Sequence, residues 1–199
     1  MSLVVLPCCV CVFLLLLLVD VSAGASPPAT ASAVSPVVAA DFVRRSCRST
    51  RYPRVCESTL VPCAPAVGRS PRRLARAALV VGADRASNCS SYLKRGGGKG
   101  GAMKDCAELS RDAEERLRQS AAEMDRMGRA GSPRFAWRLS NVQTWASAAL
   151  TDTSTCLDSL AADNKDDAAA VRRRVTAVAQ ATSNALALVN KLDPEPHKL

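Results

Sequence analysis

The sequence predicts an all-α protein, an up-down-up-down four-helix bundle preceded by an N-terminal α-hairpin that a disulfide closes. Alanine, leucine, valine and arginine dominate the composition, whereas only 4% of the 199 residues are aromatic. This balance favours helices packed through small side chains over an aromatic-rich sheet. Four long segments repeat apolar residues at steps of three and four, which is typical of a helix with one buried stripe. Stretches rich in glycine, proline or polar residues separate these segments, as expected for the connections of a bundle.

The N-terminus has the pattern of a secretory signal peptide over residues 1–25. Residues 3–19 are almost wholly apolar, and small residues follow at 23–25. A membrane-spanning helix is the alternative, but the run is short, Pro7 interrupts it and no basic cluster follows. We therefore expect cleavage, secretion and no membrane attachment of the mature chain. Cleavage removes Asp20 and three of the nine cysteines, which leaves 27 basic and 17 acidic side chains, a net charge of +10, and six cysteines. An even number of cysteines in a secreted chain predicts disulfides.

The α-hairpin is expected over residues 37–66. The preceding residues 26–36 hold three prolines and are expected to form a flexible tail. Eight residues separate Cys47 from Cys56, and Tyr52-Pro53 between them breaks any helix there. Two short helices folded back on each other are the simplest arrangement, and a Cys47–Cys56 bond would stabilise it by roughly 2.5 to 3 kcal/mol.

The four bundle helices are expected within residues 70–195. The clearest begins near Pro133, which suits a first helical turn, and continues for nearly four heptads. Along the four segments the predicted inward-facing residues are Leu74, Ala78, Val81, Ala86, Cys89 and Leu93; Cys106, Leu109, Ala113, Leu117, Ala121 and Met124; Phe135, Leu139, Val142, Ala146, Ala149, Thr153, Cys156 and Leu160; and Val171, Val175, Val178, Thr182, Ala185, Val189 and Leu192.

The sequence offers little for catalysis or metal binding. The only histidine, His197, lies near the C-terminus between Pro196 and Lys198. Acidic residues at 114–115 and 163–167 are expected to be solvated charges. A metal site lacks histidines, and the mature chain contains no CxxC. We therefore predict that the protein is not an enzyme and holds neither a cofactor nor a metal.

The four remaining cysteines of the mature chain fall into two groups. Cys106 and Cys156 each lie on a stripe that is predicted to face the bundle centre, so they are candidates for a second disulfide, which would close a loop of about 51 residues. A straight helix over residues 71–89 is about 28 Å long, which places Cys89 far from Cys63. We do not expect these two to be bonded to each other, and their redox state stays open.

Several motifs taken together resemble one known family. They are the signal peptide, C-x8-C with a central Tyr-Pro, MKDCAELSRDAEERLRQS at 103–120, NVQTWASAALTDTSTCLDSL at 141–160 and SNALALVNKL at 183–192. The chain resembles the plant invertase and pectin methylesterase inhibitor family over nearly the whole mature chain, which makes 37–195 the inhibitor domain. The resemblance implies a four-helix bundle preceded by an α-hairpin, with disulfides Cys47–Cys56 and Cys106–Cys156. Ser183 stands where many relatives carry a fifth, unpaired cysteine.

The resemblance also implies a function. The segment TWASAALTDTSTC is similar to the version found in inhibitors of pectin methylesterase, so we expect a secreted protein of the plant cell wall that covers the enzyme's substrate cleft in a stoichiometric 1:1 complex. Thr155 matches a position that relatives use near the enzyme, and Arg111, Asp112 and Glu115 are further interface candidates. Pro133, Arg134 and Phe135 resemble a motif of the invertase inhibitors, which makes acid invertase, cell-wall or vacuolar, the alternative target.

The arginines suggest another partner. Nine of them precede or begin the first bundle helix, and they could hold the protein on de-esterified pectin, a polyanion, in a salt-dependent way; a solvated basic face explains the same residues. A nucleic-acid-binding protein is disfavoured by secretion and by the lack of interleaved aromatics. A carrier of a small apolar ligand is a further alternative, disfavoured by the small, alanine-rich stripes. The nine arginines are Arg44, Arg45, Arg48, Arg51, Arg54, Arg69, Arg72, Arg73 and Arg76.

Overall fold

The computed structural model describes residues 34–96, 100–162 and 168–193, and these ranges are helical with no β-strand. The predicted signal peptide and most of the predicted tail lie outside the described residues. None of the described helices combines the length and the apolar character that crossing a membrane requires. The all-α fold that the sequence predicts is therefore confirmed.

The N-terminal hairpin consists of two short helices that one disulfide joins. Helix α2 spans Pro36–Cys47 and α3 spans Pro53–Leu60, and each begins with a proline, whose fixed φ suits a first helical turn. Cys47 and Cys56 are bonded across the turn, with their Cα atoms 5.5 Å apart. The chain then continues through a 3-10 turn, Val61–Cys63, and the one-turn helix α4, Ala64–Val67.

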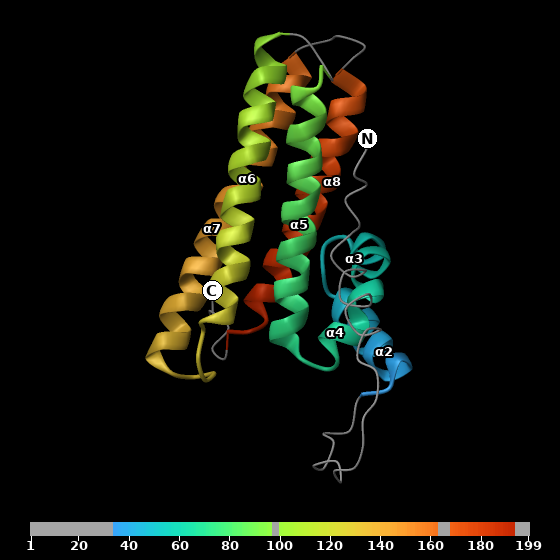
Figure 1. Cartoon of the computed structure of the whole chain (residues 1–199), viewed down its shortest axis with the longest axis vertical. Helices are drawn as coiled ribbons and strands as arrows, with labels where there is room; N and C mark the ends of the chain where they lie inside the picture. Colours follow the sequence, from blue (N-terminus) through green and yellow to red (C-terminus); the bar gives the residue numbers. More distant parts are fainter. Residues whose placement is uncertain (1–33, 97–99, 163–167, 194–199) are drawn as a thin grey trace, which may run out of the picture.

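Four long helices form the bundle, and consecutive helices run in opposite directions (Figure 1). Helix α5 starts after Ser70, whose hydroxyl oxygen accepts a hydrogen bond from the Arg73 amide at 3.2 Å. Between α6 and α7 the chain turns at Gly128 and Gly131, whose φ values of +76° and +77° favour glycine. The helices are α5, Pro71–Lys94; α6, Gly101–Asp125; α7, Pro133–Ala162; and α8, Ala168–Asn190.

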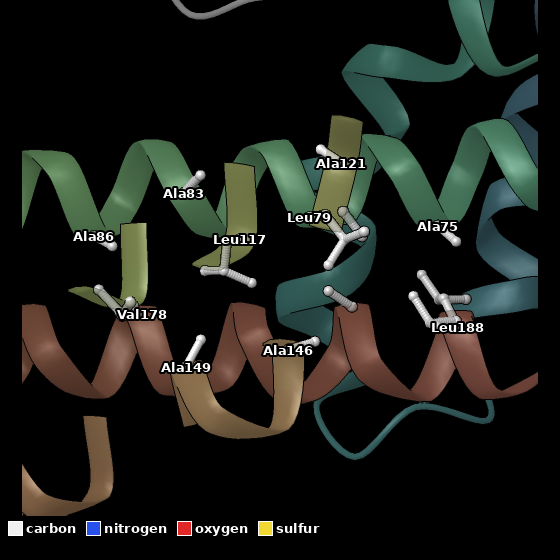
Figure 2. Close-up of a cluster of buried hydrophobic side chains, with 14 of the residues drawn as sticks. Ala75, Leu79, Ala83, Ala86, Leu117, Ala121, Ala146, Ala149, Val178 and Leu188 are labelled. Carbon is white, nitrogen blue, oxygen red and sulfur yellow. The ribbon is translucent and has the colours of Figure 1, made fainter. Parts of the chain in front are cut away.

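Each bundle helix packs mainly against the two helices that are its neighbours around the bundle, in the order α5, α6, α7, α8 and back to α5. Figure 2 shows Ala86 of α5 opposite Val178 of α8, with Leu117 of α6 between these two helices. Gly82 permits a close approach of α5 to α6, because a Cβ atom there would stand 3.3 Å from Leu117 Cδ1.

The predicted stripes are correct except at three inward positions, one of which, Leu192, follows the end of α8 and is half-buried. Val81 and Leu109 are only half-buried, whereas Gly82 and Ser110 beside them face inward. The spacing of three and four residues assigned the larger apolar residues, Val81 and Leu109, to the inward side. Where two helices are in close contact, however, there is room only for a small residue such as Gly82 or Ser110. The prediction that Val81, Leu109 and Leu192 are fully buried is therefore wrong, and all three are half-buried residues that pack against the core.

The hairpin docks on the bundle through a buried amide. Asn184 of α8 is 2% exposed. Its Oδ1 accepts a hydrogen bond from the Tyr52 amide at 3.0 Å, and its Nδ2 donates to the Tyr52 carbonyl at 2.9 Å. Lys191 donates to the Ser46 carbonyl at 3.0 Å from the end of the same helix. One side chain therefore satisfies both backbone groups at the turn of the hairpin.

Replacing Asn184 with leucine is expected to lower the free energy of unfolding by about 2 kcal/mol, because both Tyr52 backbone groups lose their partner. Hydrogen exchange of the Tyr52 amide should accelerate more than exchange in the centre of α5. Asn190→Leu is the matched control, since Asn190 is exposed and its side-chain oxygen accepts a hydrogen bond from the Gln143 side chain. Equal effects of the two variants would show that Asn184 does not hold the hairpin.

Candidate functional site

Helices α6 and α7 carry the candidate interface residues on one face, near the disulfide that joins them. Cys106 and Cys156 are bonded with their Cα atoms 4.9 Å apart, so the two helices are close at that level. Arg111 and Thr155 are exposed, and Asp112 is half-buried. Asp112 acts electrostatically on Asp152, which lies one turn of α7 before Thr155. Asp112 of α6 is therefore close to Asp152 of α7, and we call the surface that Arg111, Asp112 and Thr155 mark on the two helices the α6–α7 face.

Glu115 lies on α6 one turn after Asp112 and is exposed. Its Oε1 accepts a hydrogen bond from Gln119 Nε2 at 3.0 Å, within the same helix. Arg111 likewise pairs with its neighbour Asp112, at 3.2 Å. Both contacts are between solvated side chains and contribute little to stability. They can therefore break when a partner protein binds these side chains, with only a small loss of free energy.

Asp152 is the buried charge beneath this face. Its side chain is 12% exposed and accepts a hydrogen bond from Arg116 Nε at 2.8 Å, which links α7 to α6. Burial raises the pKa of Asp152; Arg116 opposes that shift, and the nearby carboxylate of Asp112 adds to it. The net result is a carboxyl group that takes up a proton more readily than a solvated aspartate.

The variant Asp152→Asn is expected to change how stability depends on pH. The pKa of Asp152 is raised in the folded state. Its contribution to the stability of the fold is therefore fully present below the unfolded-state pKa of about 4, and it is lost as the pH rises through the folded-state pKa. The free energy of unfolding of the parent minus that of the variant should therefore fall as the pH rises above about 4. Urea unfolding at several pH values measures this difference, with Asp158→Asn as an exposed control on the same helix. A difference that rises with pH would contradict the assignment.

The exposed side of α7 was not singled out from the sequence. It presents a run of hydroxyl side chains, and the exposed stretch is uncharged because Asp152 is the only charged residue from 139 to 157. Thr151 and Ser154 donate to backbone carbonyls of their own helix, at 3.2 Å and 3.1 Å. The spacing of three and four residues between these hydroxyls is the signal that identifies the face. The run consists of Ser140, Thr144, Ser147, Thr151, Ser154 and Thr155.

Comparison with known proteins gives the family. The model of the plant invertase/pectin methylesterase inhibitor family matches residues 41–188. The chain belongs to this family. It is 40% identical over 168 residues to the 21 kDa protein of Daucus carota, covering 80% of this chain and 87% of the relative. It is 39% identical over 176 residues to pectinesterase inhibitor 11 of Arabidopsis thaliana, covering 83% and 87%.

A solved structure has the same fold. The crystal structure of mutant form A of a pectin methylesterase inhibitor from Arabidopsis aligns with a TM-score of 0.60 at 20% identity, covering 75% of this chain and 95% of that one. The family consists of non-catalytic inhibitors, and this chain is therefore an inhibitor protein and not an enzyme.

The residues that resemble the motif of invertase inhibitors do not form one exposed surface. Pro133 and Arg134 are exposed at the start of α7, but Phe135 is only 4% exposed and belongs to the core. The Arg72 guanidinium carbon lies 5.7 Å from the centre of the Phe135 ring. This segment is also about 30 Å along α7 from Thr155, so the two groups of candidates are separate sites.

Within the ranges that the structure describes, no group of three His, Cys, Asp or Glu residues is placed to hold a metal ion. His197 and the acidic stretch at 163–167 lie outside those ranges. Cys89 is a buried free thiol, so it is not bonded to Cys63, as expected from the helix length. Burial raises the pKa of Cys89, which keeps it protonated and unreactive.

Proposed function

We propose that the mature chain is a secreted inhibitor of pectin methylesterase that covers the enzyme's substrate cleft in a 1:1 non-covalent complex and so limits the de-esterification of cell-wall pectin. The observation that carries this proposal is the α6–α7 face, where Arg111 and Thr155 are exposed on two helices that a disulfide joins. The 39% identity to a pectinesterase inhibitor supports the choice of target.

The physical character of the α6–α7 face suits this role. Its backbone is helical and cross-linked, so binding orders little of the chain and loses little conformational entropy. The uncharged hydroxyls of the run that lie nearest Thr155, from Ser147 onwards, can enter a cleft without burying unpaired charges. A stable complex of this kind buries on the order of 1,600 Å² in total.

Thr155→Arg is expected to raise the inhibition constant for pectin methylesterase roughly thirtyfold, because a bulky charge at the centre of a packed interface costs about 2 kcal/mol. The measurement is a titration of a purified pectin methylesterase with the mature protein. Asn88→Arg is the control, since it places the same charge at an exposed position of α5, away from α7. If the parent protein left several pectin methylesterases fully active from acidic to neutral pH, the proposed function would be wrong.

Acid invertase is the second candidate target, favoured by the exposed Pro133 and Arg134. Burial of Phe135 argues against it, because that ring reaches a partner only if the first turn of α7 opens. A side-by-side titration of one pectin methylesterase and one cell-wall invertase separates the two. We expect inhibition of the first enzyme at stoichiometric concentration and none of the second.

Two further proposals concern where the protein acts. Residues 1–25 would direct secretion into the cell wall, which N-terminal sequencing of exported protein tests.

The basic hairpin would contact de-esterified pectin through exposed arginines such as Arg45, Arg48 and Arg54, for which the described residues offer no carboxylate partner. Retention on a polygalacturonate column that does not change with sodium chloride would contradict this electrostatic contact.

A further inference from the structure

The hairpin end of the bundle carries a second basic surface, formed by the connection between α6 and α7. Figure 1 shows that this connection and the hairpin lie at the same end of the molecule, on opposite sides of the start of α5 in that view. Arg126, Arg129 and Arg134 are all exposed there. Together with Trp137 and Ser140 on the first turns of α7, they form a surface that we call the Trp137 corner.

Trp137 is the one strongly exposed ring among the described aromatic side chains, with 63% of its surface in solvent. The remaining described aromatics, on the hairpin and the bundle, are buried or half-buried. The Arg138 guanidinium carbon lies 5.5 Å from the centre of the Trp137 ring, and Glu123 holds Arg138 at 2.7 Å. The ring is thus supported by an anchored side chain while most of its surface stays open.

The three arginines of the corner have no ion pair with any described carboxylate, although acidic residues are close in sequence. Asp125 is paired with Arg76 at 2.7 Å, and Glu123 is paired with Arg138. The connection itself is fixed, because the Gly128 carbonyl accepts a hydrogen bond from Arg72 at 2.5 Å. The charges of Arg126, Arg129 and Arg134 are therefore available to a ligand on an ordered scaffold.

We propose that the Trp137 corner binds uronate units of an acidic polysaccharide. A pyranose ring has an apolar C–H face, which stacks on an aromatic ring, and a polar rim, which the Ser140 hydroxyl can meet. Arg134 lies three residues before Trp137 and so shares its side of the helix, where its planar guanidinium can hold a carboxylate through two parallel hydrogen bonds. Arg129 holds the carboxylate of a neighbouring unit.

Other polyanions and proteins fit the corner less well. A protein partner would need a wider apolar patch around the tryptophan, but the other large exposed hydrophobics in the described ranges, Val34, Val37 and Val38, are at the start of the hairpin. A single-stranded nucleic acid would need several stacking rings, and among the described aromatic residues only Trp137 is strongly exposed. Methyl esterification removes the carboxylate charge, so the corner should discriminate de-esterified from esterified polymer.

The corner and the α6–α7 face are separate. Trp137 and Thr155 are 18 residues apart in one helix, which is about 27 Å along α7. An inhibitor could therefore hold the polymer at one end while its other end covers the enzyme, and so stay where esters have already been removed. This consequence depends on the proposed function, but the polysaccharide site itself does not.

The test is calorimetric titration of the mature protein with a galacturonate oligomer of about ten units. The double variant Arg129→Gln and Arg134→Gln should bind about tenfold more weakly and with a smaller salt dependence, because fewer counterions are displaced. Trp137→Ser should weaken binding about fivefold at unchanged salt dependence. The matched control, Arg95→Gln with Arg173→Gln, removes two exposed charges at the opposite end of the bundle and should change the affinity less than twofold.

The outcomes are distinct. Equal affinity of the parent, the arginine pair and Trp137→Ser would overturn the site, as would equal binding of the fully methyl-esterified oligomer. Loss of binding only in Arg45→Gln, Arg48→Gln and Arg54→Gln together would place the polymer on the hairpin and also overturn it. Inhibition of pectin methylesterase is measured on the same proteins, so failure of the proposed function is seen independently of oligomer binding.

Discussion

Replacing Cys106 and Cys156 together with alanine is expected to lower the free energy of unfolding by about 4 kcal/mol. The bond joins residues with a sequence separation of 50, so its loss frees a long loop in the unfolded chain. Both cysteines are buried between α6 and α7, where they also fill the core. Because the bond ties together the helices of the α6–α7 face, the double variant should also inhibit less at temperatures near its midpoint.

Guanidinium unfolding of the oxidised parent and the double variant measures this effect. Cys89→Ala is the matched control, since it removes a buried sulfur from a free thiol and should cost only about 1 kcal/mol. The double variant should unfold at lower denaturant with a slope similar to that of the parent. A loss no larger than that of Cys89→Ala would mean that the bond adds little beyond the packing of two sulfur atoms.

Replacing Arg138 with methionine is expected to lower the free energy of unfolding by about 3 kcal/mol, because it leaves a buried carboxylate without its partner. The Glu123 side chain is 7% exposed and pairs with Arg138 at 2.7 Å, across α6 and α7. Asn141 Nδ2 also donates to Glu123, at 3.3 Å, and compensates only part of the loss.

The double variant Glu123→Gln with Arg138→Met should recover a large part of this loss. It removes the unpaired charge, and it also removes Arg138 Nε, which is buried without a hydrogen-bond partner. A double-mutant cycle by urea unfolding gives the coupling energy, which we expect to be about 1 to 3 kcal/mol in favour of the pair. Additive effects of the two substitutions would show that Glu123 and Arg138 do not act together.

The sequence determined the helices, their order and the pattern of their buried stripes, because these follow from local chemistry. Prolines at 36, 53, 71 and 133 begin helices, and glycines follow the ends of α4, α5 and α6. Steps of three and four placed Phe135, Leu139 and Val142 in the core, as the structure confirms. The disulfide pairs that the family resemblance implied are also those of the structure.

Tertiary structure decided which polar residues share a surface and which are buried. Periodicity indicates that Asp112 and Asp152 lie on helices, but only the packing of α6 on α7 brings them within electrostatic reach. The burial of Asn184 against the Tyr52 backbone joins residues 132 positions apart, which no local pattern indicates. Likewise, Trp137 stays exposed beside Phe135, which is buried. The reason is physical: a helical period fixes which residues share one side of a rod, whereas partners across rods depend on how the rods are packed.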